Sequence, residues 1–130
     1  MITLAIRTDN PDAELHILRD TKIVMSRRWR AHRELSDTLH SELAKLLETL
    51  HMHQDDISNV VAYQGPGSFT GLRIGLATAN ALAYSLHVPI VGASGDGWIV
   101  NGLNQLSTSE PGKYVQPVYG ANPHTTKPVK

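Results

Sequence analysis

A glycine-dense stretch holds the residues of this sequence that are best suited to chemistry. It reads Gly65-Pro66-Gly67-Ser68-Phe69-Thr70-Gly71-Leu72-Arg73-Ile74-Gly75. Glycine permits positive φ and the close approach of another group, and the ring of Pro66 fixes φ between two glycines. The hydroxyls of Ser68 and Thr70 can cap the first amides of a following helix, where free amides and the helix dipole attract anions. The candidate anion or partner contacts are Gly65, Gly67, Ser68, Thr70, Gly71 and Arg73.

The spacing of this stretch differs from the familiar glycine-rich motifs. A Walker loop ends in Gly-Lys-Ser/Thr, but here Gly71 is followed by Leu72. A dinucleotide-binding fingerprint needs a third glycine where this chain has Thr70. The Gly-x-Ser-x-Gly nucleophile elbow is missed by one position, because Gly67 directly precedes Ser68. Two interpretations stay open: a plain structural turn, and a site for an anion or a partner.

A buried strand and a helix are expected on either side of the turn. Val60 to Tyr63 is a short apolar run, and Gly75 to His87 is rich in alanine and leucine and has no proline. Small residues recur every four positions and form a bare ridge: Gly71, Gly75, Ala79 and Ala83. Another element can approach such a ridge closely, which is either the protein's own sheet or a helix of another chain.

Three strands, a long helix and a later strand complete the predicted fold. Residues 2–6, 14–18 and 22–26 read as strands joined by tight turns, which predicts an antiparallel meander. Residues 34–51 place their leucines on one helical face. The strand at 90–93, opened by a proline, is expected to lie parallel to the strand before the turn, because the intervening helix makes a crossover.

A basic patch with an aromatic residue directly follows the third predicted strand, which covers residues 22–26. Arg27, Arg28, Trp29 and Arg30 are candidates for RNA contact, since arginine contacts phosphate and tryptophan stacks on bases. The alternative is a solvated strand edge, whose charges discourage pairing with another chain. Both interpretations stay open.

Composition restricts the function classes. The 130 residues include 12 basic and 12 acidic side chains, so no global field attracts nucleic acid. Cysteine is absent, which excludes disulfides and thiolate metal sites and fits a reducing cytoplasm. The histidines are scattered, and we assign none a catalytic role; we expect no metal and no cofactor. No apolar run approaches the about 18 residues of a membrane helix, so we expect a cytoplasmic protein.

The full string GPGSFTGLRIGLATANALA is more specific than any generic motif. Together with residues 85–94 it resembles the TsaB (YeaZ) family, the non-catalytic dimerisation subunit of the bacterial machinery that makes threonylcarbamoyladenosine in tRNA. The resemblance implies a ribonuclease H-like mixed sheet of the actin-like ATPase superfamily, in the order βββαβαβ. Family members typically carry Asp-Thr after the first strand, where this chain has Arg7-Thr8. We expect Asp9 to point elsewhere, so a catalytic carboxylate is lost there.

The resemblance also implies partners. TsaB-like subunits pair with their catalytic homologue TsaD through the first two helices of each. A TsaE-like ATPase is a further possible partner, tRNA contact is expected to be indirect, and a homodimer is possible in isolation. The alternatives are a stand-alone ATPase, a glycoprotease-like hydrolase, or a self-associating module. The residues expected at the partner interface are Leu39, Leu43, Leu46, Gly71, Leu72, Gly75, Leu76, Ala79 and Ala83.

The C-terminal part departs from the family. Asp96 to Leu106 predicts one short helix with Ile99, Leu103 and Leu106 facing inward. Residues 1–120 are therefore expected to form a single lobe, remodelled from about residue 95, of a shortened TsaB-like member. Residues 121–130 are expected to be a flexible tail, since they contain two prolines and no core-forming pattern.

Overall fold

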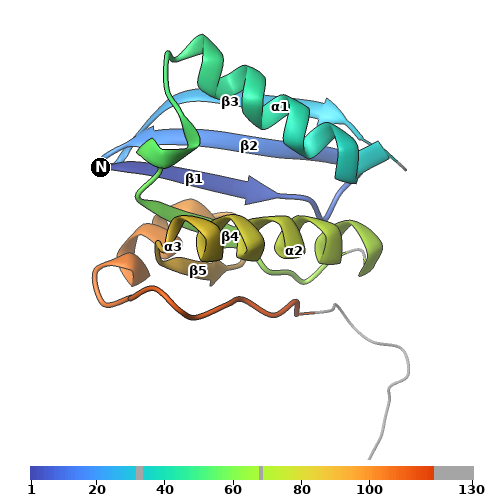
Figure 1. Ribbon diagram of the computed structural model, residues 1–130. Coiled ribbons are helices and arrows are strands. Elements are labelled where there is room, and N and C mark those ends of the chain that lie inside the picture. Colours follow the sequence, from blue (N-terminus) through green and yellow to red (C-terminus); the bar gives the residue numbers. More distant parts are fainter. Residues whose placement is uncertain (32–33, 68, 119–130) are drawn as a thin grey trace, which may run out of the picture.

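The computed structural model describes residues 1–31, 34–67 and 69–118, with the side chain of Phe69 left out. They form one mixed sheet with helices on both faces (Figure 1). The elements in chain order are β1 (Ile2–Arg7), β2 (Asp12–Arg19), β3 (Lys22–Arg30), α1 (Leu35–Thr49), the short 3-10 helix η2 (Gln54–Asp56), β4 (Asn59–Tyr63), α2 (Phe69–Leu86), β5 (Ile90–Ala93) and α3 (Trp98–Leu106). This order confirms the predicted fold class.

The sheet has the strand order β3-β2-β1-β4-β5. β1, β2 and β3 pair antiparallel, which confirms the meander, and β4 lies parallel to both β1 and β5. The register places Ile6 opposite Leu15 and Val60 opposite Ile90, so apolar side chains of neighbouring strands share a face. α2 supplies the long crossover that two parallel strands need.

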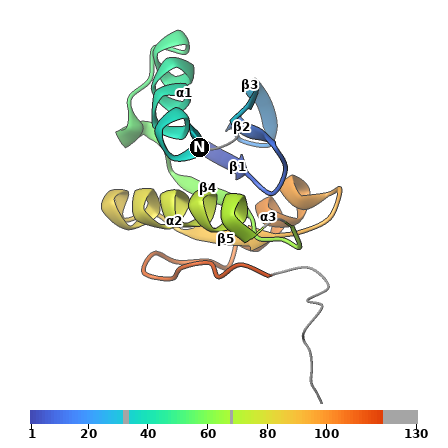
Figure 2. The same ribbon diagram turned by 90° about the vertical axis from the view of Figure 1, so that its right-hand side faces the viewer.

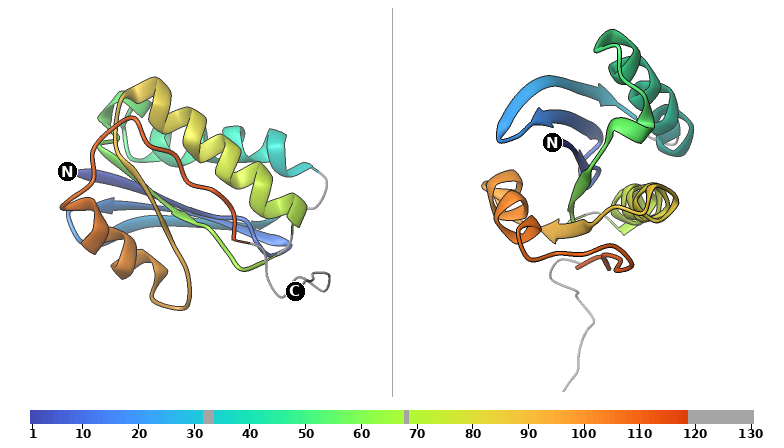
Figure 3. Two further views of the ribbon diagram at one scale, coloured as in Figure 1. Left: turned by 90° about the horizontal axis from the view of Figure 1, so that it is seen from below. Right: turned by 60° about the vertical axis from the view of Figure 1, so that its left-hand side comes forward.

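Helices cover the two faces unequally. α1 and α2 lie on one face and α3 lies on the other (Figures 2 and 3). α3 packs on β4 and β5. The buried side chains of the three helices and of β1, β2, β4 and β5 belong to one hydrophobic core, against which the partly buried Met25 and Trp29 of β3 pack.

The leucine stripe of α1 faces this core. Five leucines of the helix are buried: Leu35, Leu39, Leu43, Leu46 and Leu47. The sequence prediction of this helix and of its inner face is confirmed. The same burial bears on the partner interface, because Leu39 and Leu46 are each 1% exposed and cannot reach a second chain.

The small-residue ridge of α2 is also used inside the chain. Ala79 and Ala83 are buried, as are Leu72 and Leu76. Gly75 lies so close to β1's end that a methyl group there would overlap the Thr8 side chain. The ridge therefore packs on the protein's own sheet. Six residues predicted as partner contacts face inward in the single chain, so that assignment gains no support here and stays a prediction: Gly71, Leu72, Gly75, Leu76, Ala79 and Ala83.

The inner face of α3 contains the predicted residues and two more that are buried deeper. Trp98 and Gly102 are its buried residues, while Ile99, Leu103 and Leu106 are only partly buried against the core. Gly102 lies against the Val61 side chain, where a Cβ would overlap it. Because this glycine lets the helix axis approach β4 closely, the side of α3 that carries Gly102 makes the closest contact with the sheet.

Residues 113–118 run as an extended segment beside α2, and we call them the strap. The Asn80 side chain of α2 holds the strap through both backbone groups of Val115, with N–O distances of 2.9 and 2.8 Å. The amide of Val118 donates to the Gln64 carbonyl oxygen at 2.6 Å. The predicted flexible tail, 121–130, lies outside the described residues.

Candidate functional site

The glycine-rich turn is built against the end of β1. Thr8 donates from Oγ1 to the carbonyl oxygen of Gly71 at 2.7 Å. A Cβ at Gly67 would overlap the Asp9 side chain, and one at Gly71 would overlap the Thr8 carbonyl oxygen. The glycines are therefore needed for close approach, and the turn and the first turns of α2 form one unit with the end of β1.

An ion pair occupies the space beside this turn. The Arg7 guanidinium donates from Nε to Asp9 Oδ1 at 2.7 Å and from Nη2 to Oδ2 at 3.2 Å. The hydrogen bond with Asp9 raises the pKa of Arg7. The guanidinium also lies 3.9 Å from the ring centre of Tyr63, whose hydroxyl donates to the Pro66 carbonyl oxygen at 3.2 Å. Asp9, whose side chain is 6% exposed, does reach the turn, contrary to our expectation.

The remaining candidates of the turn lie in different places. Gly65, at φ +119°, contacts the strap at the Val118 carbonyl group. Thr70 and Arg73 are exposed on the first turns of α2. Ser68 lies outside the described residues. The described residues of the turn thus bring Gly67 and Gly71 together with Thr8 and Asp9, and leave Thr70 and Arg73 toward solvent.

A groove of about 520 Å³ lies between α1 and α2 on their outer side. α2 contributes Ala77, Thr78, Ala81, Leu82 and Ser85, and α1 contributes His40 and Leu43. Ala77 and Ala81 are exposed and lie one turn apart. The sequence does contain a signal for this groove, since Ala77 and Ala81 are four residues apart, as are the residues of the buried ridge. From the sequence we considered only the face of the helix that carries the ridge.

The arginines of the basic patch are all paired on β3. Arg28 donates to Glu14 at 3.0 Å and Arg30 to Asp12 at 3.2 Å, while Arg27 reaches Glu42 of α1 at 2.7 Å from Nε. Trp29 is half-buried and donates from Nε1 to the Thr38 hydroxyl at 2.9 Å. RNA contact by Arg27, Arg28, Trp29 and Arg30 stays a prediction.

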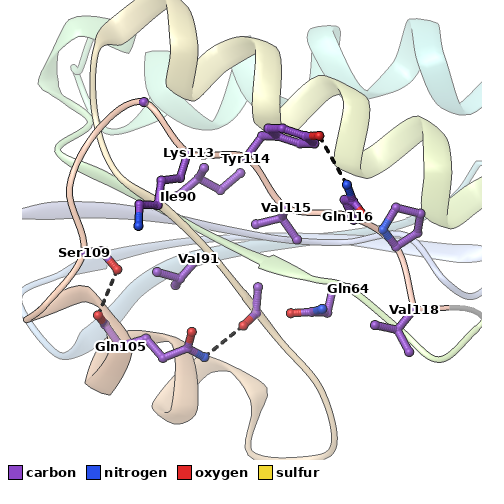
Figure 4. A pocket seen from close by; sticks show the side chains of 13 residues that line it. Gln64, Ile90, Val91, Gln105, Ser109, Lys113, Tyr114, Val115, Gln116 and Val118 are labelled. Atoms are coloured by element: carbon purple, nitrogen blue, oxygen red, sulfur yellow. Dashed lines mark hydrogen bonds between the residues drawn. The ribbon is translucent and has the colours of Figure 1, made fainter.

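A second cavity, of about 780 Å³, lies along β5 (Figure 4). Its walls are β5, the strap and the end of α3. Gln105 of α3 donates from Nε2 to the Gly92 carbonyl oxygen at 2.9 Å. Among the described residues no group of three or more histidine and acidic side chains is arranged to hold a metal ion. None of the described helices has the length and hydropathy needed to cross a membrane.

Solved structures establish the fold class. The chain matches YeaZ from Pseudomonas aeruginosa with a TM-score of 0.66 and 24% identity, over 72% of this chain and 43% of that one. It matches RuvC from T. thermophilus with a TM-score of 0.53 and 11% identity, over 85% of this chain and 99% of that one. The sheet, its helices and these neighbours define a ribonuclease H-like protein.

Comparison of sequences gives the family. The model for TsaD, tRNA N6-adenosine threonylcarbamoyltransferase, matches residues 29–110, and the chain belongs to this family. The tRNA threonylcarbamoyladenosine biosynthesis protein TsaB of Bacillus subtilis is 34% identical over 94 residues, which are 72% of this chain and 41% of that protein. The resemblance to TsaB is confirmed. The chain spans about two fifths of the length of the TsaB relative.

Proposed function

We propose that this chain is a subunit of the machinery that makes threonylcarbamoyladenosine in tRNA. In this role it binds a TsaD-like transferase and leaves the transfer reaction to that partner. The family match and the likeness to TsaB support the pathway. The observation that carries the binding role is the groove between α1 and α2, which lies outside the core.

The groove suits a helix of the partner. Ala77 and Ala81 lie one turn apart and are exposed, so a second helix can approach the α2 backbone closely along this line. The half-buried Leu82 adds apolar surface at the same place. This location replaces the inward-facing ridge as the proposed interface, while it keeps the first two helices of the chain as the contacting elements.

The Arg7–Asp9 pair argues against a stand-alone nucleotide hydrolase. A hydrolase of this kind needs a carboxylate that is free to bind Mg²⁺ near the turn. Both oxygens of the Asp9 carboxylate already accept hydrogen bonds from Arg7. Titration of ATP with and without Mg²⁺ tests this point, and Mg²⁺-dependent binding with turnover would contradict it.

The other partners belong to the same proposal. We propose residues 1–120 as a single lobe, with tRNA contacted indirectly and a TsaE-like ATPase as a further partner. In the absence of the transferase, the exposed apolar groove also allows pairing of two copies. Sedimentation of the isolated chain distinguishes the homodimer from the monomer.

Copurification with the cognate TsaD-like protein tests the interface. Ala81→Arg places a long charged side chain in the groove without touching the core, since Ala81 is exposed. We expect this variant to fold normally and to lose the partner. Asn104→Arg is the matched control, because Asn104 is an exposed helical position on α3, across the sheet from the groove.

The two variants give a clear decision. Loss of copurification with Ala81→Arg and retention with Asn104→Arg supports the proposal. Equal retention by both variants would show that the groove is not the interface. Equal loss by both would show that pairing depends on overall charge rather than on this surface.

A further inference from the structure

A hydrogen-bonded row of side chains crosses β2 and β3 on the face of the sheet that carries α3. Ser26 and the His16 Nδ1 atom lie 2.7 Å apart, and His16 Nε2 lies 3.0 Å from Glu14 Oε1. Arg28 donates from Nη2 to the other oxygen of Glu14 at 3.0 Å. The register places Ser26 opposite His16 and Arg28 opposite Glu14, so these residues form adjacent cross-strand pairs.

The chemistry of this row fixes the tautomer of neutral His16. The carboxylate of Glu14 only accepts hydrogen bonds, so the Nε2 atom that contacts it carries the proton. Nδ1 then has a free lone pair and accepts the hydrogen bond from the Ser26 hydroxyl. The order is that of an activated nucleophile: a hydroxyl, a base within hydrogen-bond reach, and a third group that orients the base.

The imidazole is held in place while the hydroxyl stays accessible. The His16 ring centre lies 6.0 Å from that of Trp98, and the Trp98 ring makes an edge contact with Tyr63 at 5.9 Å. The side chains of His16 and Glu14 are 15% and 12% exposed. Ser26 itself is exposed on the edge strand. A fixed base beside an accessible hydroxyl is the arrangement that nucleophilic attack requires.

A small cavity adjoins the row. It has a volume of about 370 Å³, and its walls include Arg7, Arg28 and Arg30, against the carboxylates of Asp12 and Glu14. Each guanidinium has five N–H donors, and the ion pairs use only some of them. Successive pairs on one face of a strand lie about 6.8 Å apart, so a short substrate spans from Ser26 to this cavity. The three guanidiniums are balanced by the carboxylates of Asp9, Asp12 and Glu14. The cavity therefore offers guanidinium N–H donors that the ion pairs leave unused, and such donors suit a carboxylate.

We propose that Ser26 and His16 form a hydrolytic site for small carboxylic esters that carry a negatively charged group. The Ser26 oxygen attacks the acyl carbon while its proton moves to His16 Nδ1. The bond from the acyl carbon to the alcohol oxygen breaks, and the alcohol leaves with that proton. Water then attacks the acyl-serine, gives its proton to His16, and releases the acid as Ser26 regains the proton.

Glu14 acts as a positioning residue in this site, since it fixes the tautomer and touches no reacting atom. The site lies on the sheet face opposite α1 and α2, and the inference goes beyond the proposed function. A purely structural row would need the same hydrogen bonds but would not make Ser26 reactive. The test must therefore measure reactivity as well as structure.

Labelling with diisopropyl fluorophosphate tests the nucleophile directly. In this reaction the Ser26 oxygen binds phosphorus and fluoride leaves. Ser41 is an internal control, because it is exposed on α1 and its hydroxyl contacts only the Thr38 carbonyl oxygen among the hydrogen bonds found. We expect labelling of Ser26 to be about 100-fold faster than that of Ser41, at the lower end of general-base catalysis. Equal rates would overturn the proposal.

Ester hydrolysis tests turnover and substrate class. We expect the full chain to hydrolyse mono-4-nitrophenyl terephthalate, whose carboxylate cannot reach its own ester carbonyl, about tenfold faster than 4-nitrophenyl benzoate, since one charge-assisted hydrogen bond contributes about that much. Ser26→Ala should abolish both activities at an unchanged circular dichroism spectrum. Hydrolysis that persists in Ser26→Ala would overturn the site, and equal rates for the two esters would overturn the assignment of an anionic substrate.

The tautomer of His16 can be measured in the unmodified chain, without any substitution. Two-bond ¹⁵N–¹H spectra of the unmodified chain should show His16 protonated at Nε2 and unprotonated at Nδ1. In Glu14→Gln the amide can donate to Nε2, so the preference should weaken and Ser26 labelling should slow. A proton on Nδ1 in the unmodified chain would overturn the proposal.

Discussion

Replacing Gly75 by alanine separates the packing role of the α2 ridge from helix propensity. In an ordinary helix this change stabilises by about 1 kcal/mol, because glycine is the poorer helix former. Here the added Cβ would overlap three atoms of the Thr8 side chain. Thr8 is 2% exposed and its hydroxyl is bonded to the Gly71 carbonyl oxygen, so it has little room to move.

The expected magnitude follows from two opposing terms. Overpacking of a buried site costs about 1–3 kcal/mol. The overlap involves the Thr8 oxygen and two carbons, which places this site in the upper part of that range. After subtraction of the helix-propensity gain of about 1 kcal/mol, we expect a net loss of about 1–2 kcal/mol in the free energy of unfolding.

Urea unfolding followed by circular dichroism measures this loss. The variant Thr8→Ala removes two of the three overlapping atoms, including the closest one. In that background the cost of Gly75→Ala should fall by about 1 kcal/mol, which is a coupling that contacting residues show in double-mutant cycles. Gly97→Ala is the control, since no atom lies within 4 Å of a Cβ there.

A stabilising or neutral effect of Gly75→Ala would refute the packing argument, provided that Gly97→Ala stays within about 0.5 kcal/mol of the unmodified chain. An equal cost in both Thr8 backgrounds would place the strain elsewhere. Either result would remove the Thr8 contact as the reason for a glycine at position 75.

Three further substitutions test other contacts. Glu42→Gln should lower the free energy of unfolding by about 1–2 kcal/mol in urea, because it breaks the pair with Arg27; the loss is below that of a fully buried pair since the Arg27 side chain is 46% exposed. Asn80→Ala should release the strap, so that the Val115 amide loses protection in hydrogen exchange while the core amides keep theirs. Trp98→Ala should cost about 3–5 kcal/mol in the same urea assay, since the side chain is 4% exposed. Losses below about 0.5 kcal/mol at Glu42 or Trp98, or an unchanged Val115 amide, would contradict these contacts.

The strands and helices could be predicted because their signals are local. Apolar alternation and tight turns define the meander of β1, β2 and β3, and a regular leucine stripe defines α1. The parallel pairing of β4 and β5 follows from one physical rule, since parallel neighbours need a crossover such as α2. These features do not depend on which side chains meet in space.

The orientation of α2 could not be predicted from its sequence. A ridge of small residues indicates that another element approaches the helix closely. The same pattern is expected whether that element is the chain's own sheet or a helix of a partner. The structure uses Gly75 and Ala79 for the sheet. The exposed pair Ala77 and Ala81 has the same spacing, and only its position relative to β1 distinguishes it.

Pairings between distant charges were also beyond sequence analysis. Asp9 was expected to point away from the glycine-rich turn, yet it packs against Gly67 and pairs with Arg7. Likewise, the four residues of the basic patch gave no indication of the carboxylates that accept from Arg27 and Arg28, because these lie on α1 and β2. The composition gives the number of charged side chains, but which of them form ion pairs depends on the strand register and on how the helices pack.

The contact at Asn80 has a wider consequence. A side-chain carboxamide offers one donor and one acceptor, like the peptide unit of a strand, so α2 can bind an extended segment as a sheet edge would. Attachment of the C-terminal segment to the helix thus rests mainly on a single amide group. Loss of this one group would detach the strap from α2, while the bond from Val118 to Gln64 and the buried Val115 side chain would still hold it against the sheet.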